Sequence, residues 1–134
     1  MEVQAPSAPQ PGATGYRQLR VWERAFDLAL QVIRAANRFP KPEAAVLADE
    51  LRSQAILLPV LLSPGPPGRD APGLSGRLSR LLQVLARIEV QILIAAEVGY
   101  LERSGFLETE IRVLEMRRIA AGMVRRIRDR ASRR

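Results

Sequence analysis

Two short segments of the sequence carry polar side chains of the kind used in acid–base chemistry. Asp49 and Glu50 are neighbours, and Glu89 and Gln91 lie within a very apolar stretch. Paired carboxylates can transfer protons or hold a divalent cation. Adjacent residues on a helix point about 100° apart, however, so Asp49 and Glu50 do not share a site. We interpret this pair as solvated or ion-paired surface. We expect Glu89 to be a structural ion-pair partner of an arginine from another helix.

The 134-residue chain contains no cysteine and no histidine. Their absence excludes a thiol nucleophile, a disulfide scaffold, a Cys/His zinc site and every mechanism that uses histidine as acid or base. Gly65, Gly68 and Gly73 are separated by prolines, which lack the N–H groups that a phosphate-binding loop requires. We therefore expect no enzymatic activity, with no catalytic residue, no metal site and no cofactor.

Positive charge is concentrated near the C-terminal end. The chain has 21 basic and 14 acidic residues, and residues 112–134 alone hold nine arginines against two acids, a difference that equals the net charge of +7. Guanidinium groups bind phosphate with bidentate geometry, and residues 107–134 contain no aromatic side chain for base stacking. We therefore expect salt-sensitive, sequence-nonspecific binding of RNA or DNA. The candidate residues are Arg117, Arg118, Arg125, Arg126, Arg128, Arg130, Arg133 and Arg134.

Two other interpretations of these arginines stay open. Cations near a helix C-terminus are favourable on a solvated face, and an acidic protein could bind in place of nucleic acid. A basic amphipathic helix can also lie on a membrane surface, but here the apolar face is needed for the core. The longest apolar run, residues 55–62, contains Pro59 and is far shorter than the roughly 18–20 residues of a membrane span. We expect a cytoplasmic protein with no membrane partner.

Apolar residues recur at spacings of three and four in four segments, which predicts helices over about 17–38, 42–62, 75–98 and 107–131. The first pattern ends at Phe39–Pro40, the second begins at Pro42, and the third ends at Gly99 before a turn at Ser104–Gly105. No segment alternates as a strand would. The sequence therefore predicts an all-α fold, an antiparallel up-down four-helix bundle over residues 16–131.

The remaining segments are expected to be irregular. Residues 1–15, rich in proline and alanine, are predicted to form a disordered leader. Residues 63–73 hold four prolines and three glycines and are predicted to form a loop. Residues 132–134 are expected to be a basic tail. Pro59 should kink the second helix or remove one of its hydrogen bonds.

The helical spacing also assigns faces. In the first helix the expected inward residues are Leu19, Trp22, Phe26, Ala29 or Leu30, Ile33 and Ala36. In the fourth helix they are Ile111, Leu114, Ile119, Met123, Val124 and Ile127. The second and third helices carry more apolar residues than one buried stripe needs, which indicates an interface between copies of the chain. The candidate interface residues are Leu57, Leu61, Val90, Leu93 and Ile94.

Several short motifs resemble a known family. The matching residues, which span about 17–130, are Leu19, Val21–Trp22, Phe26–Asp27–Leu28, Phe39–Pro40–Lys41, Glu43, Leu51–Arg52, Pro59, Glu89, Gln91, Ile94–Ala95 and Gly99–Tyr100–Leu101. In this order they resemble bacterial four-helix bundle proteins related to those encoded by intervening sequences in large-subunit ribosomal RNA genes. The resemblance implies a ring-like homopentamer without enzymatic activity. A remote branch is the accessory variability determinant of diversity-generating retroelements, which works with a reverse transcriptase and nucleic acid.

The sequence departs from this family at its most polar segment. Leu61 and Ser63–Pro64–Gly65 stand where the family has polar residues, and Arg87 replaces an acid. That polar cluster is therefore not carried over to this chain. The main hypothesis is a non-enzymatic homo-oligomer that binds nucleic acid or a ribonucleoprotein. The alternatives are a protein-interaction adaptor without a nucleic-acid role and a reverse-transcriptase accessory subunit.

Overall fold

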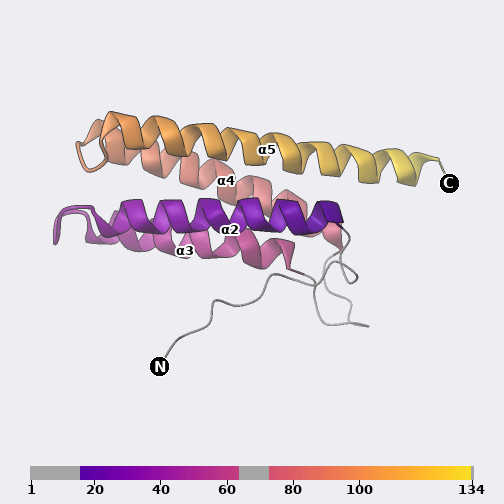
Figure 1. The fold of residues 1–134 in the computed structure, drawn as a ribbon, viewed down its shortest axis with the longest axis horizontal. Helices are drawn as coiled ribbons and strands as arrows, with labels where there is room; N and C mark the ends of the chain where they lie inside the picture. Colours follow the sequence, from indigo (N-terminus) through magenta and orange to yellow (C-terminus); the bar gives the residue numbers. More distant parts are fainter. Residues whose placement is uncertain (1–15, 64–72, 134) are drawn as a thin grey trace, which may run out of the picture.

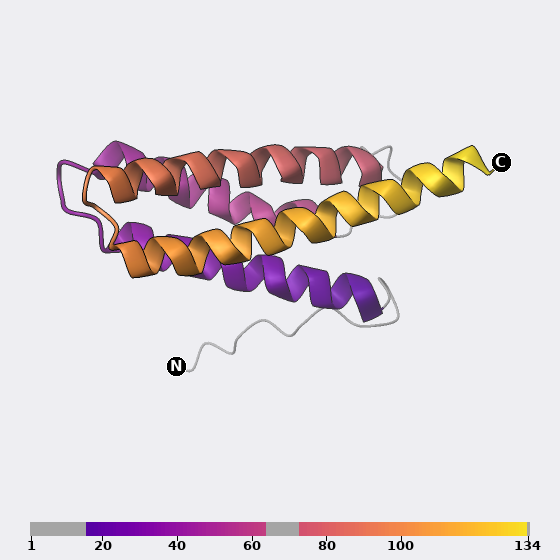
Figure 2. The ribbon, with the colours of Figure 1, turned by 90° about the horizontal axis from the view of Figure 1, so that it is seen from above.

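The computed structural model describes residues 16–63 and 73–133, which contain four α-helices and no β-strand. The helices are α2 (Tyr16–Asn37), α3 (Ala45–Leu62), α4 (Leu74–Glu97) and α5 (Arg103–Ser132). Consecutive helices run in opposite directions (Figure 1 and Figure 2). Neighbours in sequence pack together, and α5 closes the ring by packing against α2. The predicted antiparallel four-helix bundle is thus confirmed. The leader 1–15, most of the predicted loop and Arg134 lie outside the described residues.

Helix α4 supplies the largest share of the core. Its largest fully buried side chains are Leu78, Leu81, Leu85, Ile88 and Ile92. Full burial of a leucine or isoleucine side chain contributes about 1.5–3 kcal/mol, so this stripe dominates the stability of the bundle. Helix α2 contributes mainly smaller side chains, such as Ala25, Ala29 and Ala36. Small residues allow the backbones of neighbouring helices to approach closely.

Gly99 ends α4, as predicted, by adopting a left-handed conformation with φ of 87°. The Tyr100 N–H donates to the Ala95 carbonyl at 2.8 Å, and the Gly99 N–H donates to the Ala96 carbonyl at 3.2 Å. This pair of hydrogen bonds is the Schellman arrangement, which satisfies carbonyl groups left free at the helix end. The chain therefore reverses direction within residues 98–102 and enters α5 at once.

The predicted turn at Ser104–Gly105 is wrong, because both residues lie in the first turn of α5. Gly99 and the four residues around it already reverse the chain, so no second turn is required. The Phe106 N–H donates to the Glu102 carbonyl at 2.9 Å, which makes Glu102 the N-cap. A Cβ atom on Gly105 would lie 3.2 Å from the Cδ1 of Leu101. Glycine at this position thus allows the turn to pack closely on the helix.

A matched pair of substitutions should separate backbone conformation from packing. Gly99→Ala is expected to lower the free energy of unfolding by about 1 kcal/mol, because alanine is strained at positive φ although space is open around the Cβ position. Gly122→Ala, inside α5, is expected to raise it by up to about 1 kcal/mol. Urea denaturation measures both. Two shifts of the same sign would contradict the assignment of these backbone conformations.

Helix α3 begins at Ala45, three residues later than predicted, because residues 41–44 form a turn. The Ala44 N–H donates to the Pro40 carbonyl and the Ala45 N–H to the Pro42 carbonyl, at 3.0 and 3.1 Å. The helix then continues through Pro59 to Leu62, although the proline lacks the N–H that would complete the ladder. At this end the Trp22 indole donates to the Ser63 hydroxyl at 3.1 Å, which ties α3 to α2.

Helix α5 is the longest element, with 30 residues against 24 in α4, 22 in α2 and 18 in α3. At 1.5 Å per residue, α5 is about 9 Å longer than α4, the second-longest of these helices. Its C-terminal end projects past the ends of the other helices (Figure 1 and Figure 2). None of the helices in the described part of the chain is long and apolar enough to cross a membrane.

Candidate nucleic-acid interface

The arginines predicted to bind phosphate gather on the second half of α5. Six of them are exposed and form no ion pair with another described residue: Arg118, Arg125, Arg126, Arg128, Arg130 and Arg133. We call these six residues the α5 arginine cluster. Between residues 117 and 133 the single acidic residue is Asp129. With six exposed arginines and a single acid, the segment is strongly basic, and Arg134 lies beyond the described residues.

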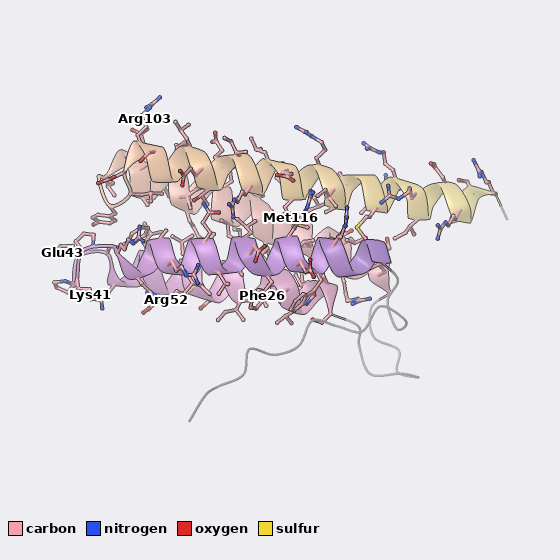
Figure 3. All side chains as sticks on the ribbon, in the orientation of Figure 1. Phe26, Lys41, Glu43, Arg52, Arg103 and Met116 are labelled. Atoms are coloured by element: carbon pink, nitrogen blue, oxygen red, sulfur yellow. The ribbon has the colours of Figure 1, made fainter. Side chains whose placement is uncertain are left out.

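Helical spacing explains why these guanidinium groups face outward. Ile119, Met123, Val124 and Ile127 are half-buried and pack against the core, and Ala120 is fully buried. These apolar residues occupy one side of α5, so the arginines between them must take the remaining sides. Side chains with nitrogen-containing ends extend from this part of α5 on the side away from the other helices (Figure 3). The segment is thus amphipathic, with its polar side open to a ligand.

Arg117 differs from the other predicted residues, because its Nη1 donates to Oε2 of Glu89 at 2.5 Å. The prediction that Glu89 pairs with an arginine from another helix is thereby confirmed. Such a half-exposed pair contributes at most about 1 kcal/mol to stability. It does, however, hold the Arg117 guanidinium against α4. We therefore leave Arg117 out of the α5 arginine cluster.

The carboxylates near the start of α3 also have structural roles. Arg52 donates to Asp49 at 2.5 Å and to the Asn37 side chain at 3.0 Å, so Asp49 is ion-paired as predicted and Arg52 links α3 to α2. Glu50 is exposed. Over residues 16–63 and 73–133, no group of three or more acidic side chains is placed to hold a metal ion.

The predicted interface residues fall into two groups. Val90, Leu93 and Ile94 are exposed on α4, as an intermolecular contact requires. Leu61 is only 8% exposed and belongs to the core of the protomer itself, so it is not available for a contact between copies. Leu57 is half-buried against the same core.

Helix α5 exposes an apolar stripe that the helical periodicity predicts to be buried. Ile111 is 64% exposed and Leu114 is 41% exposed, which corrects the expectation that both face inward. The buried residues of this helix are instead Thr109, Val113, Met116 and Ala120. Both stripes follow the same spacing of four and three residues, so periodicity alone could not choose between them. Met116 points from α5 toward α2 (Figure 3).

The described residues thus define an all-α bundle whose longest helix ends in a basic segment. Comparisons with known protein families, curated protein sequences and solved structures find no match to this chain.

Proposed function

We propose that this protein is a non-enzymatic, self-associating four-helix bundle that binds the phosphate backbone of nucleic acid through the α5 arginine cluster. The observation that carries the proposal is the set of six exposed guanidinium groups without ion-pair partners among the described residues. Those nearest the C-terminus, such as Arg130 and Arg133, lie on the helix end that projects beyond its neighbours, so a long polyanion can approach this end without steric hindrance. The proposal includes a cytoplasmic location, where RNA is accessible.

The chemistry of the cluster favours the backbone over the bases. Arginine presents two adjacent N–H donors that match phosphate oxygens. Unpaired bases, by contrast, are usually bound by stacking on aromatic side chains. Phe106 is the single aromatic residue of α5, and it lies in the first turn, at the opposite end of the helix from the cluster. Binding should therefore be insensitive to sequence and strongly dependent on salt.

Self-association is supported by an outer apolar band on α4 and α5. The band comprises Val90, Leu93, Leu107, Ile111 and Leu114, all exposed. Because α4 and α5 are antiparallel and joined by residues 98–102, Leu93 lies level with Leu107 and Val90 lies near the level of Ile111. A contiguous exposed apolar surface of this kind is typical of protein–protein contacts. The family resemblance favours a ring of five copies.

Assembly would strengthen nucleic-acid binding without any new type of contact. Each copy brings one arginine cluster, and linked clusters bind a long polyanion with a high effective concentration. A weak affinity per subunit thereby becomes a useful affinity for the assembly. This coupling connects the apolar band to the basic helix end.

The proposal is tested by replacing Arg125, Arg126 and Arg128 with glutamate. At low salt the triple variant should bind a labelled RNA hairpin and a labelled DNA duplex at least about a hundredfold more weakly than the wild type, because attraction becomes repulsion. For the wild type, the logarithm of the affinity should fall with the logarithm of salt at about 0.9 per phosphate contacted in duplex DNA. Fluorescence anisotropy at several salt concentrations measures both quantities.

The matched control carries Arg80→Glu, Arg87→Glu and Arg103→Glu, which make the same change in net charge on exposed arginines elsewhere. Arg103 points away from the bundle at the end of α5 opposite the cluster (Figure 3). This variant should retain most of the affinity. An equal loss in both variants would show a general charge effect, and no detectable binding of the wild type at low salt would refute the proposal.

A second candidate function, that of a protein-interaction adaptor, has one specific observation in its favour. Ile56 and Val60 on α3 are more than half exposed, and they share one end of the α2–α3 pair with the stacked rings of Trp22 and Phe26, whose centroids are 5.2 Å apart. Partner binding through this surface should survive high salt and be lost on Val60→Asp. Leu61→Asp would be uninformative because that side chain is buried in the core.

A further inference from the structure

The outward side of α5 carries its exposed arginines in two separate rows. Successive residues of an α-helix point about 100° apart, so residues three, four or seven positions apart share a side. By this spacing the α5 arginine cluster divides into a first row, Arg118, Arg125 and Arg128, and a second row, Arg126, Arg130 and Arg133. The mean directions of the two rows are about 120° apart. The cluster therefore follows two edges of the outward side and leaves a strip between them.

Contacts with the neighbouring helices show which edge each row follows. Arg117 forms its ion pair with α4, and Arg128 lies three helical turns further along the same side, so the first row follows the α4 edge. Glu115 forms its ion pair with α2, and Arg126 lies three turns further along that side, so the second row follows the α2 edge. Helix α2 begins about 12 Å beyond this ion pair, whereas the second row begins about 16 Å beyond it. Helix α2 therefore does not run beside the second row.

The strip between the rows consists mainly of Gly122 and Asp129, which lie two helical turns apart on one side. Glycine has no side chain, so a ligand can approach the helix backbone closely at this point. Outside the adjoining residues and the helix backbone, the atom nearest to a Cβ at this position would be Nη2 of Arg125, at 3.8 Å. Packing within the protein therefore does not require a glycine here. Asp129 is exposed, and its place on the strip separates this carboxylate from an anion bound along either edge.

Two rows of guanidinium groups with little bulk between them match a groove that has a phosphate strand on each side. The major groove of B-form DNA is about 12 Å wide and admits an α-helix, whose diameter with side chains is about 10–12 Å. The major groove of A-form RNA is too deep and narrow for this. A single strand offers one line of phosphates and is usually bound with aromatic stacking. On the floor of the DNA groove a carboxylate such as Asp129 meets base edges, some of which carry amino groups, and no phosphate.

We propose that the ligand of the α5 arginine cluster is double-stranded B-form DNA and that α5 lies in its major groove, an inference that rests on the function proposed above. The first row contacts the phosphates of one strand and the second row those of the other. Gly122 is the point of closest approach to the base pairs. Phosphate contacts position a protein without reading the sequence, so this placement agrees with nonspecific binding.

The experiment compares three labelled ligands by fluorescence anisotropy with the full-length protein: a DNA duplex, an RNA duplex of the same sequence, and one DNA strand alone. We expect the DNA duplex to bind at least about tenfold more tightly than either of the others at the same salt concentration. Methyl green, which occupies the major groove, should displace the protein from the DNA duplex. Netropsin, which occupies the minor groove, should not displace it.

Two double variants test whether both rows contact phosphate. Arg118→Ala with Arg125→Ala removes part of the first row, and Arg126→Ala with Arg130→Ala removes part of the second. Each pair should lower the slope of log affinity against log salt for the DNA duplex by about 2, because each removes two phosphate contacts. The control is Arg34→Ala with Arg38→Ala, a pair of exposed arginines on α2, which should leave the slope unchanged.

Gly122→Leu tests the strip between the rows. The leucine side chain would fill this strip and should weaken binding of the DNA duplex at least about tenfold. Leucine favours a helix over glycine, so urea denaturation should show no loss of stability. Equal affinity for the RNA duplex, an effect of one row alone, or wild-type affinity in Gly122→Leu would overturn the placement in the groove and leave the arginine cluster as the binding site. Absence of binding to all three nucleic acids at low salt would refute the proposed function as well.

Discussion

A chain carrying Ile111→Glu and Leu114→Glu should remain folded and become monomeric. Both side chains are substantially exposed in the protomer, so their replacement removes little intramolecular packing. In an assembly that uses the outer apolar band, however, the two carboxylates would be buried at the centre of an apolar contact, where unpaired charge is very unfavourable. At micromolar protein concentrations the variant should show no self-association. Light scattering coupled to size-exclusion chromatography measures the mass directly.

The control for this result is Val46→Glu with Ile56→Glu on α3, which makes the same chemical change on exposed residues outside the band. It should keep the mass of the wild type. A wild-type protein that is monomeric at all concentrations would refute self-association. If the Ile111/Leu114 variant has the same mass as the wild type, the interface does not include the outer apolar band. The monomeric variant should also bind nucleic acid with a smaller salt dependence, since fewer clusters contact one strand.

Leu85→Ala should produce the largest loss of stability of any single substitution considered. Leu85 is 0% exposed and lies in the middle of the buried stripe of α4. Truncation of such a side chain removes its burial and leaves a cavity, which together cost about 2–5 kcal/mol. A domain of this size has a total stability of about 5–15 kcal/mol, so the variant should be close to unfolding at moderate temperature.

Urea denaturation monitored by circular dichroism measures this loss as a shift of the midpoint at constant slope. Val46→Ala is the control, because Val46 is 79% exposed and its truncation should change stability by less than about 0.5 kcal/mol. Equal effects of the two substitutions would contradict the assignment of the core. The measurement should be repeated at several protein concentrations, since assembly adds a concentration-dependent contribution.

The helical architecture follows from residues whose effect on the backbone is local. Phe39–Pro40 and Gly99 end helices because proline restricts the residue before it and glycine tolerates positive φ, and neither effect depends on distant partners. The sequence therefore predicts the number and order of the helices. The turn that it predicts at Ser104–Gly105 is wrong, because a turn there depends on how completely the preceding residues have already reversed the chain.

Helix faces are harder to predict than helix positions. In α2 the buried stripe is formed mainly by Ala25, Leu28, Val32 and Ala36, whereas Trp22 and Phe26 are half-buried and stack on each other. Large aromatic side chains suggest burial, but four closely packed helices leave room for small ones. In α5, Val113 is buried and Ile111 is exposed because of the way the neighbouring helices pack against it. No local feature of the sequence predicts which of the two is buried.

The arginine cluster and the hydrogen bond between Gln31 on α2 and Thr109 on α5 also differ in how far the sequence predicts them. Net charge is a property of composition, so a basic segment can be recognised from the order of the amino acids alone. Gln31 and Thr109 are 78 positions apart, and their contact depends on the register of two helices that are neighbours only in the folded state. Neither residue type is unusual enough to attract attention alone. The Oε1 of Gln31 is buried without a hydrogen-bond partner among the described residues, and this property too exists only in the folded state.

The projection of α5 has a further consequence for how the helix behaves before and after it meets a polyanion. Beyond Ile127 no apolar side chain of α5 packs against the core, so the last turn is held mainly by its own backbone hydrogen bonds. Arg126 and Arg130 are four residues apart on this stretch, a spacing at which like charges repel and weaken a helix by about 0.2–0.5 kcal/mol. The final turn of free α5 should therefore fray. Phosphate groups that neutralise these charges would remove the repulsion, so amide hydrogen exchange over residues 127–132 should slow on binding.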